Sequence, residues 1–369
     1  TKIESKWELI RVSDFCEITS SKRIYKSEYV EEGIPFYRTK EIVDLSSKLP
    51  IQTELYISEN RYIEIKNEFG IPKVGDILIS AVGTIGISWI VSNENPFYFK
   101  DGNILWLRNI NANSVFIKMM LDYIFENNIG FEKVGSAYKA LTIEKLLDFK
   151  IPLPPLDIQQ KIVSEIEVLE AKEKKEKEEI EKGKETIVNL FYNLETKADK
   201  IVRLSDETIF QVSIGKRVLK NEFVDNGKIP VYSANVIEPF GNIDKLLIED
   251  FSKPSVLWGI DGDWMVNHLP KDYPFYPTDH CGVLRVKDNS INEKYLAFIL
   301  EKEGKVFEFS RTKRASIDRI QGIKIPVPPL SEQQKFVSEI EKIEEQIKTL
   351  ETEISEIPKQ KEVILKKYL

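Results

Sequence analysis

Cysteine and histidine are both scarce in this chain, with two of each among 369 residues. Cys16 and Cys281 lie far apart in the sequence, which excludes a disulfide framework and favours a reducing compartment, so we expect a cytoplasmic protein. The histidines, His268 and His280, do not combine with the cysteines into any metal-ligand spacing, and we expect no metal site. No apolar run approaches the length of a transmembrane helix, and the first residues lack the apolar core of a signal peptide, so we expect no membrane association.

Catalytic and nucleotide-binding motifs are also missing from the sequence. There is no G-x-x-x-x-G-K-[ST] phosphate-binding loop, and no Asn- or Asp-Pro-Pro-aromatic run of the adenine-methyltransferase type. The net charge is −7, from 53 basic and 60 acidic side chains, which argues against a protein that holds DNA by charge alone. That balance still permits a sequence reader with local basic patches. We therefore predict that the chain is not an enzyme by itself.

An internal repeat is the most informative feature that is present. Residues 151–167 return as residues 325–341, a spacing of 174, and both segments open with Ile-Pro-Leu/Val-Pro-Pro-Leu and continue through Gln-Gln-Lys. Weaker matches lie upstream, for example Arg-Val-Ser-Asp at 11–14 with Arg-Leu-Ser-Asp at 203–206. A match this long indicates duplication, so the chain can present two similar surfaces to a paired or two-fold partner.

Each half of the repeat mixes strand and helix patterns. Short apolar runs predict strands at 77–81 and 104–107, and again at 256–258 and 283–286. Amphipathic stretches predict helices at 115–125 and near 295–300. We expect a mixed α+β fold with a pseudo-two-fold internal repeat, in which two α/β domains (1–150 and 201–324) are joined by two long, antiparallel coiled-coil helices (151–200 and 325–369).

The Pro-rich segments are predicted to start these helices. Pro-Pro favours an extended backbone, and Asp157 and Ser331, each with a glutamine three residues later, match the capping-box spacing. Gly183 and Pro358 stand at nearly equivalent positions and predict a kink or a helix end. Apolar residues then follow a heptad whose seam would pair the two helices. The seam residues are Ile162, Ile166, Leu169, Ile180, Ile187 and Leu190 in the first helix, and Phe336, Ile340, Ile343, Ile347, Leu350 and Ile354 in the second.

This arrangement resembles the specificity subunit of type I restriction-modification systems. The resemblance covers essentially the whole chain and is carried by Leu153-Pro-Pro-Leu-Asp-Ile-Gln-Gln-Lys-Ile162 and Val327-Pro-Pro-Leu-Ser-Glu-Gln-Gln-Lys-Phe336, each following one variable domain. It implies two target recognition domains, each of which reads one half of a bipartite, asymmetric site in double-stranded DNA. It also implies that the helices set the spacing between the half-sites and dock two methyltransferase subunits, with motor and nuclease subunits as further candidate partners.

The same resemblance implies that S-adenosylmethionine, ATP and Mg²⁺ belong to the partner subunits, and that this chain holds no cofactor. For the glutamine pairs Gln159–Gln160 and Gln333–Gln334, we expect one member to cap its helix and the other to face the methyltransferase.

Basic residues at repeated positions are the candidates for DNA contact. Lys22–Arg23 and Lys216–Arg217 occupy equivalent places in the two halves, and phosphate contact competes there with a simple solvated turn. The densest basic cluster is Arg311, Lys313 and Arg314, whose counterpart in the first half holds Tyr138 and Lys139. Thr84, within Gly83-Thr-Ile-Gly86, is expected in a turn that can approach a phosphate. Arg38 and Lys40 are candidates for reading guanine edges.

Two other functions stay open on the sequence alone. The chain could be the specificity subunit of a bifunctional type II (type IIB-like) restriction-modification enzyme, which would carry the same motifs. It could also be a scaffold whose two domains bind proteins. Binding to random duplexes in the presence of the methyltransferase separates a DNA reader from a scaffold.

Overall fold

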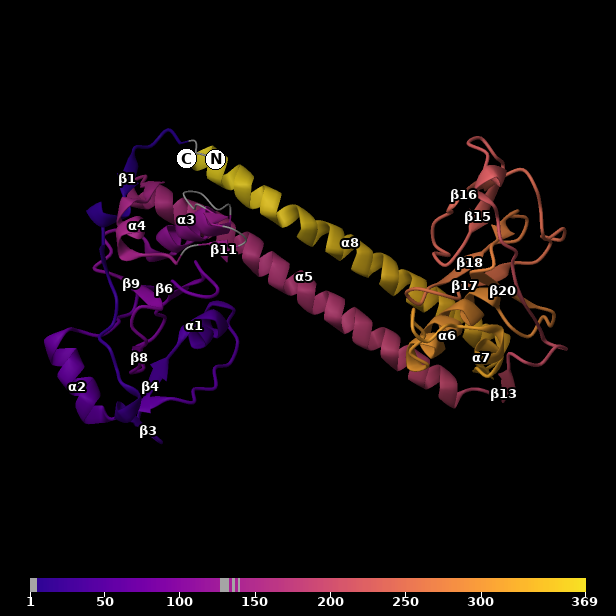
Figure 1. The fold of residues 1–369 in the computed structure, drawn as a ribbon, viewed down its shortest axis with the longest axis horizontal. Coiled ribbons are helices and arrows are strands. Elements are labelled where there is room, and N and C mark those ends of the chain that lie inside the picture. The colour runs from indigo at the N-terminus through magenta and orange to yellow at the C-terminus, as the bar shows by residue number, and fades with distance from the viewer. Residues whose placement is uncertain (1–4, 127–132, 135–136, 139) are drawn as a thin grey trace. The chain divides into compact units, whose positions relative to one another are not determined.

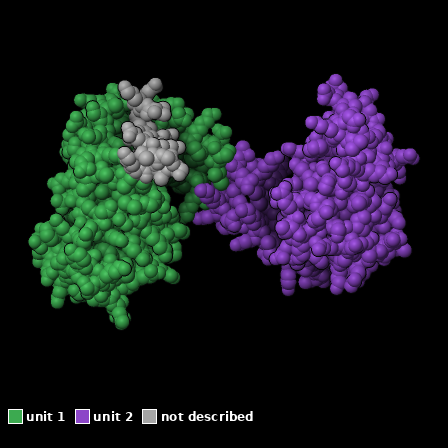
Figure 2. Space-filling model, in the orientation of Figure 1, with its two compact units in different colours: residues 1–175, 354–369 green, residues 176–353 purple. Residues whose placement is uncertain are grey.

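The computed structural model describes residues 5–126, 133–134, 137–138 and 140–369. The chain divides into two compact units, which Figure 2 shows in two colours. Unit 1 consists of residues 1–175 and 354–369, and unit 2 consists of residues 176–353. Each unit therefore contains one globular part and a stretch of both long helices.

Unit 1 is built on an antiparallel sheet with the strand order β2–β9–β6–β7. These strands are Glu17–Thr19, Ile104–Arg108, Ile77–Ser80 and Ser88–Ile90. A second sheet, β3–β5–β4–β8, contains Tyr29–Val30, Tyr56–Ile57, Ile34–Tyr37 and Tyr98–Phe99, with β4 and β8 parallel. The helices are α1 (Thr39–Ser46), α2 (Glu59–Glu68), α3 (Ser114–Glu126) and α4 (Ile143–Asp148). Two pairs complete the unit, β1 (Leu9–Arg11) with β12 (Lys150–Pro152), and β10 (Lys133–Val134) with β11 (Ala137–Tyr138).

Unit 2 repeats this framework with fewer additions. Its main sheet has the order β14–β20–β17–β18, from Phe210–Ile214, Cys281–Val286, Ser255–Gly259 and Val266–Leu269. The second sheet is β16 (Gly241–Ile243), β15 (Ile229–Tyr232) and β19 (Tyr276–Pro277), again with one parallel pair. Strands β13 (Lys200–Arg203) and β21 (Lys324–Val327) pair as β1 and β12 do, and α6 (Glu293–Val306) and α7 (Ile317–Gln321) correspond to α3 and α4. The predicted strands and helices are confirmed, and α1 and α2 are insertions of unit 1.

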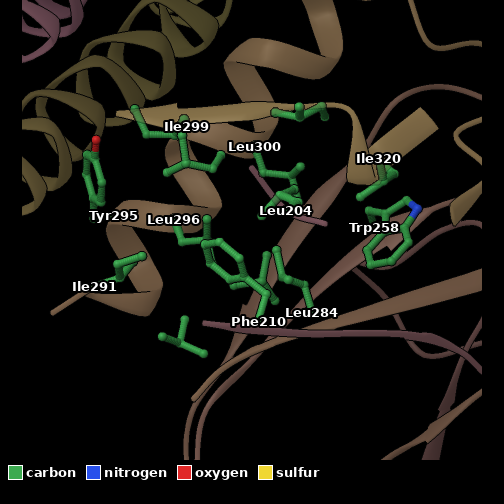
Figure 3. Close-up of a cluster of buried hydrophobic side chains, with 14 of the residues drawn as sticks. Leu204, Phe210, Trp258, Leu284, Ile291, Tyr295, Leu296, Ile299, Leu300 and Ile320 are labelled. Atoms are coloured by element: carbon green, nitrogen blue, oxygen red, sulfur yellow. The ribbon is translucent and has the colours of Figure 1, made fainter. Parts of the chain in front are cut away.

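The core of unit 2 lies between its main sheet and α6 (Figure 3). Helix α6 buries Tyr295, Leu296, Ile299 and Leu300, whose spacing places them on one face. Across from them Trp258 of β17 is fully buried, and its indole N–H donates to the carbonyl of Ala315 at 2.9 Å. Each large side chain buried in this way stabilises the fold by about 1.5–3 kcal/mol relative to an exposed position. The strand, the helix and the segment that contains Ala315 thus share one core.

The two long helices are α5 (Leu156–Thr196) and α8 (Leu330–Tyr368), labelled in Figure 1. Both begin earlier than the capping-box expectation, so Asp157 and Ser331 lie inside the first turn rather than ahead of it. The carbonyls of Pro155 and Pro329 accept the first amide hydrogen bonds instead, from residues 158–159 and 332–333. A proline carbonyl can accept normally even though its ring nitrogen cannot donate, which is why the Pro-Pro pair can sit directly before the helix.

Within each unit the helix segments run antiparallel. In unit 1 the Lys361 amine lies 3.1 Å from the Glu170 carboxylate, and Lys367 lies 2.9 Å from Glu165, so one helix ascends as the other descends. In unit 2 the rings of Phe191 and Phe336 are 5.0 Å apart. All the predicted seam residues are buried or half-buried, while the residues between them are mostly exposed. The two helices therefore use their apolar stripes to cover one another.

A kink or a helix end was expected at Gly183 and Pro358. The helix end is wrong, because α5 and α8 run through both positions, and the kink stays a prediction. Gly183 instead marks a close approach between the helices. A β-carbon there would lie 3.2 Å from Cδ1 of Ile347, which is tighter than an ordinary contact. Pro358 is accommodated next to the buried Ile357 within unit 1. Packing between the two helices thus stabilises them by more than Gly183 and Pro358 destabilise them locally.

The start of the described chain and its last residues lie side by side in unit 1 (Figure 1). The Trp7 indole donates to the Tyr368 carbonyl at 2.7 Å, and the Lys6 amide donates to the carbonyl of Leu369 at 2.5 Å. These contacts complete the helix-end packing of unit 1.

Candidate nucleic-acid interface

In each unit a backbone hydrogen bond joins two segments that are far apart in the sequence. One segment follows strand β6 or β17, and the other precedes the short helix α4 or α7. In unit 1 the amide of Leu141 donates to the Ala81 carbonyl at 3.1 Å. In unit 2 the amide of Ala315 donates to the Ile260 carbonyl at 3.0 Å. Segments that are far apart in the sequence are thus brought together in the same way twice. This repeated junction holds the Gly83–Gly86 loop in unit 1 and the Arg311–Arg314 segment in unit 2.

The loop that contains Thr84 is a tight connection between β6 and β7. The Gly86 amide donates to the Ser80 carbonyl at 2.8 Å, and the Ser80 hydroxyl donates to the Thr84 carbonyl. Gly83 and Gly86 have φ values of +81° and +86°, which residues with a side chain rarely adopt. Thr84 is exposed on this loop. The predicted turn is therefore present, and its contact with phosphate stays a prediction.

The basic cluster of unit 2 is exposed, but its members differ in how they are held. Arg311, Lys313 and Arg314 all face solvent. Lys313 lies 3.7 Å from the carboxylate of Glu308. The Arg314 guanidinium binds both carboxylate oxygens of Asp261, with the Nη2–Oδ2 distance at 2.9 Å. Arg314 is therefore oriented by a second residue, and Lys313 is much less constrained.

Asp261 also binds a histidine, since His280 Nδ1 contacts the same carboxylate. Burial would raise the pKa of Asp261, but hydrogen bonds from His280 and Arg314 outweigh it, so the pKa lies below its ordinary value. The Asp261 carboxylate therefore stays ionised at neutral pH. Sequence reasoning missed both Asp261 and His280, because their meeting depends on strand pairing between β17 and β20 and on no local motif.

The repeated pairs Lys22–Arg23 and Lys216–Arg217 follow the first strand of the main sheet in each unit, and all four side chains are exposed. The Lys22 amine lies 4.3 Å from the centre of the Phe69 ring, and the Arg23 guanidinium lies 2.9 Å from the Asp101 carboxylate. In unit 2 the Lys216 amide donates to the Pro277 carbonyl at 3.1 Å. Their equivalent placement agrees with phosphate contact, which remains a prediction.

Arg38 has a structural role that the sequence did not reveal. Its backbone amide and its guanidinium both donate to Glu41, at 2.7 and 2.9 Å, and the guanidinium also lies 3.2 Å from Glu54. Glu41 is almost fully buried, so Arg38 neutralises a charge that could not stay there alone. Glu41 and Glu54 together engage Nη2, so a bidentate guanine contact through Nη1 and Nη2 would require the Glu54 ion pair to break. Lys40 is exposed in the first turn of α1 and is not constrained in this way.

Tyr138 and Lys139 were also predicted to contact DNA. Tyr138 belongs to strand β11, which pairs with β10. Lys139 lies outside the described residues. The predictions of DNA contact for both stay predictions.

The glutamine pairs split into one buried and one exposed member. Gln159 and Gln333 are buried, and each accepts the amide of an asparagine that starts the neighbouring helix, Asn113 or Asn292, at 2.8 Å. Each also donates to the carbonyl of the first proline of its Pro-Pro pair, at 2.7 and 2.8 Å respectively. Because these two side chains are buried, the exposed members of the pairs are the ones that can face a partner in this structure. Gln159 and Gln333 also bind residues outside α5 and α8 and so do not cap their own helices.

Gln160 and Gln334 are exposed next to them. The Gln160 side chain accepts a hydrogen bond from the Asn113 amide group at 2.9 Å. Contact between these two glutamines and a methyltransferase stays a prediction.

Known proteins match this chain along most of its length. The model of the type I restriction modification DNA specificity domain matches residues 4–182 and 200–359. The chain therefore belongs to this family, with one match in each half of the repeat, and the resemblance inferred from the two Pro-Pro-Leu-x-x-Gln segments is confirmed.

Relatives with curated names agree with the family match. The MjaIX type I restriction enzyme specificity subunit of Methanocaldococcus jannaschii is 24% identical, and the match covers 99% of this chain and 93% of that protein. A Haemophilus influenzae protein with a provisional name of the same kind is 34% identical, but this match covers 46% of this chain and 41% of that protein.

The fold is shared with solved structures. The S subunit of a type I system from M. genitalium has a TM-score of 0.58 at 15% identity, with 100% of this chain and 98% of that chain covered. The HsdS subunit from Thermoanaerobacter tengcongensis has a TM-score of 0.51 at 16% identity, with coverage of 100% and 97%. The predicted combination of two mixed domains and two long helices is confirmed as the fold of this group. In the part of the chain that the structure describes, no helix combines the length and apolarity needed to cross a bilayer.

Proposed function

We propose that this chain is the DNA-reading subunit of a type I restriction-modification complex, in which each unit reads one half of a bipartite site. The observation that carries the proposal is the repeated junction, where Leu141 binds Ala81 and Ala315 binds Ile260. The same backbone framework presents different side chains in the two units, which is what two unlike half-sites require. Phosphate contacts from the basic pairs would fix register, and loop side chains would read bases.

The helices α5 and α8 are proposed to set the gap between the half-sites. Their antiparallel packing is fixed by apolar seams and by ion pairs such as Lys361–Glu170. An α-helix rises 1.5 Å per residue, and DNA rises about 3.4 Å per base pair, so the number of heptads converts directly into a number of unread bases.

Two methyltransferase subunits are the proposed partners, one for each copy of the helix start. Exposed Gln160 and Gln334 lie at equivalent places beside the Pro-Pro pairs and supply one matching polar contact each. S-adenosylmethionine, ATP and Mg²⁺ would be held by the methyltransferase and by motor or nuclease subunits, and this chain alone would neither cut nor methylate DNA. The complex would act in the cytoplasm, where the DNA of a bacterial or archaeal cell lies.

Selection from random duplexes tests this proposal. The chain and its methyltransferase are incubated with a random library, and the bound DNA is sequenced. The expected result is a split motif, two short specified sequences separated by a fixed unread gap. Binding without any enriched motif would favour the scaffold alternative. Cleavage on both sides of the motif by the purified pair would instead favour the bifunctional type II enzyme.

A further inference from the structure

Three backbone positions converge at the repeated junction of each unit. In unit 2, the Ile260 amide donates to the His280 carbonyl at 3.0 Å, and Ile260 in turn accepts from Ala315. These two backbone hydrogen bonds bring together Asp261, His280 and Arg314. In unit 1, the Ala81 amide donates to the Asn103 carbonyl at 2.8 Å, and Ala81 accepts from Leu141.

The equivalent residues of unit 1 are therefore Val82, Asn103 and Ala140. The framework is the same, and the side chains differ in size, polarity and charge. Variable side chains on a shared backbone are what a reading position needs, because the backbone fixes where each side chain meets the DNA.

The side chains of unit 2 form a connected group at the surface. The Arg314 side chain is 58% exposed and the His280 side chain 49% exposed, whereas that of Asp261 is 24% exposed. The carboxylate thus lies beneath the two nitrogen-bearing side chains. Arg314 uses Nε and Nη2 to bind Asp261.

Arginine has five N–H groups in a planar fork, so this contact leaves a second edge, formed by Nη1 and the other Nη2 hydrogen, for a ligand. A phosphate contact would not require such an arrangement. A flexible cation such as Lys313 neutralises phosphate without being oriented, and a carboxylate placed near DNA reduces the attraction. A fixed guanidinium edge matches the O6 and N7 acceptors of guanine, which accept two parallel hydrogen bonds in the major groove. Asp261 therefore weakens the electrostatic attraction to DNA, but it orients the Arg314 guanidinium.

We propose that Arg314 reads a guanine in the half-site bound by unit 2, and that Asp261 is the positioning residue that orients it. His280 binds the same carboxylate and limits its rotation. The inference rests on the proposed function, since it requires that unit 2 binds DNA. At the equivalent place in unit 1, Val82, Asn103 and Ala140 supply no cation, so that half-site is not read by an arginine there.

The test compares conservative variants of the full chain, assembled with its methyltransferase, by sequencing the methylated sites. Arg314→Lys keeps the charge and removes the bidentate edge, and Asp261→Asn keeps the size and removes the carboxylate. Arg203→Lys, at an exposed position on β13, is the matched control. Duplexes with the read G·C pair replaced by A·T measure discrimination directly in a binding assay.

Arg314→Lys is expected to reduce discrimination at one G·C position roughly tenfold or more, because one bidentate contact is lost. Asp261→Asn should relax the same position to a smaller extent, and the other half-site should not change. Discrimination unchanged in both variants, or a loss of affinity that is uniform across all sequences, would overturn the inference. A wild-type complex that shows no split motif would instead refute the proposed function, so the two failures are distinguishable.

Discussion

Replacing Gln333 by alanine tests whether the hydrogen bonds of the buried glutamine stabilise unit 2. The Gln333 side chain is fully buried, and its amide makes three hydrogen bonds. The oxygen accepts from the Asn292 amide at 2.8 Å, and the nitrogen donates to the carbonyls of Ser290 and Pro328 at 2.9 and 2.8 Å. Alanine would leave the half-buried Asn292 N–H without its acceptor and the buried Pro328 carbonyl without its donor.

Each group left without its partner costs about 1–3 kcal/mol, so the free energy of unfolding of unit 2 should fall by about 2–6 kcal/mol. Gln334→Ala removes the same side chain one position along on an exposed surface and should change stability by less than about 0.5 kcal/mol. Urea denaturation followed by tryptophan fluorescence gives the free energies, because Trp258 lies in the core of unit 2. Faster hydrogen exchange at the Asn292 amide would locate the effect.

A Gln333→Ala variant as stable as Gln334→Ala would show that the hydrogen bonds of Gln333 do not stabilise unit 2. Gln334→Ala has a second use, because it should weaken methyltransferase binding without changing stability if the exposed glutamine is a docking residue.

Three further results are expected. Burial alone would raise the pKa of Glu41, but hydrogen bonds from Arg38 hold it below its ordinary value. This pair therefore stabilises unit 1 above about pH 4.3, and the contribution is lost as pH falls further. Arg38→Ala leaves the effect of burial in place, so the dependence on this carboxyl in urea midpoints measured between pH 3 and 7 should shrink or reverse its sign. Gly183 and Ile343 face each other in the helix pair. Inserting one heptad after Gly183 and one before Ile343 should lengthen the unread gap by roughly three base pairs without changing either half-site. An active complex with the original gap would contradict the spacer role. Burial raises the pKa of the Cys16 thiol to about 12, so alkylation at pH 8 should be roughly a thousandfold slower in the native protein than in urea, as mass spectrometry can measure.

The repeat and the periodic segments could be predicted from the sequence because their signals are local. The heptad seam needs only the spacing of apolar residues, and residues such as Ile162 and Ile340 are indeed buried. The same holds for the helix at 115–125, which the structure assigns as α3. Strong periodic patterns over long stretches leave few alternatives.

Side-chain partners across the chain could not be predicted in this way. Asp261, His280 and Arg314 are brought together by strand pairing and by the Ala315–Ile260 hydrogen bond, and nothing in their local sequences signals the contact. The ion pair of Arg38 with Glu41 could not be predicted for the same reason, because Glu41 was not recognisable as buried. The Gly183 position shows the opposite error, since a local breaker was given more weight than the packing of the helix pair.

The central claim is that the two units read separate half-sites, and a domain exchange tests it most directly. Residues 1–150 are replaced by the corresponding segment of a relative with a different target, and the hybrid is assembled with the methyltransferase. Sequencing of the methylated DNA should show that one half of the motif has changed, with the other half and the gap preserved. A hybrid that methylates a motif altered in both halves, or the original motif unchanged, would contradict the account.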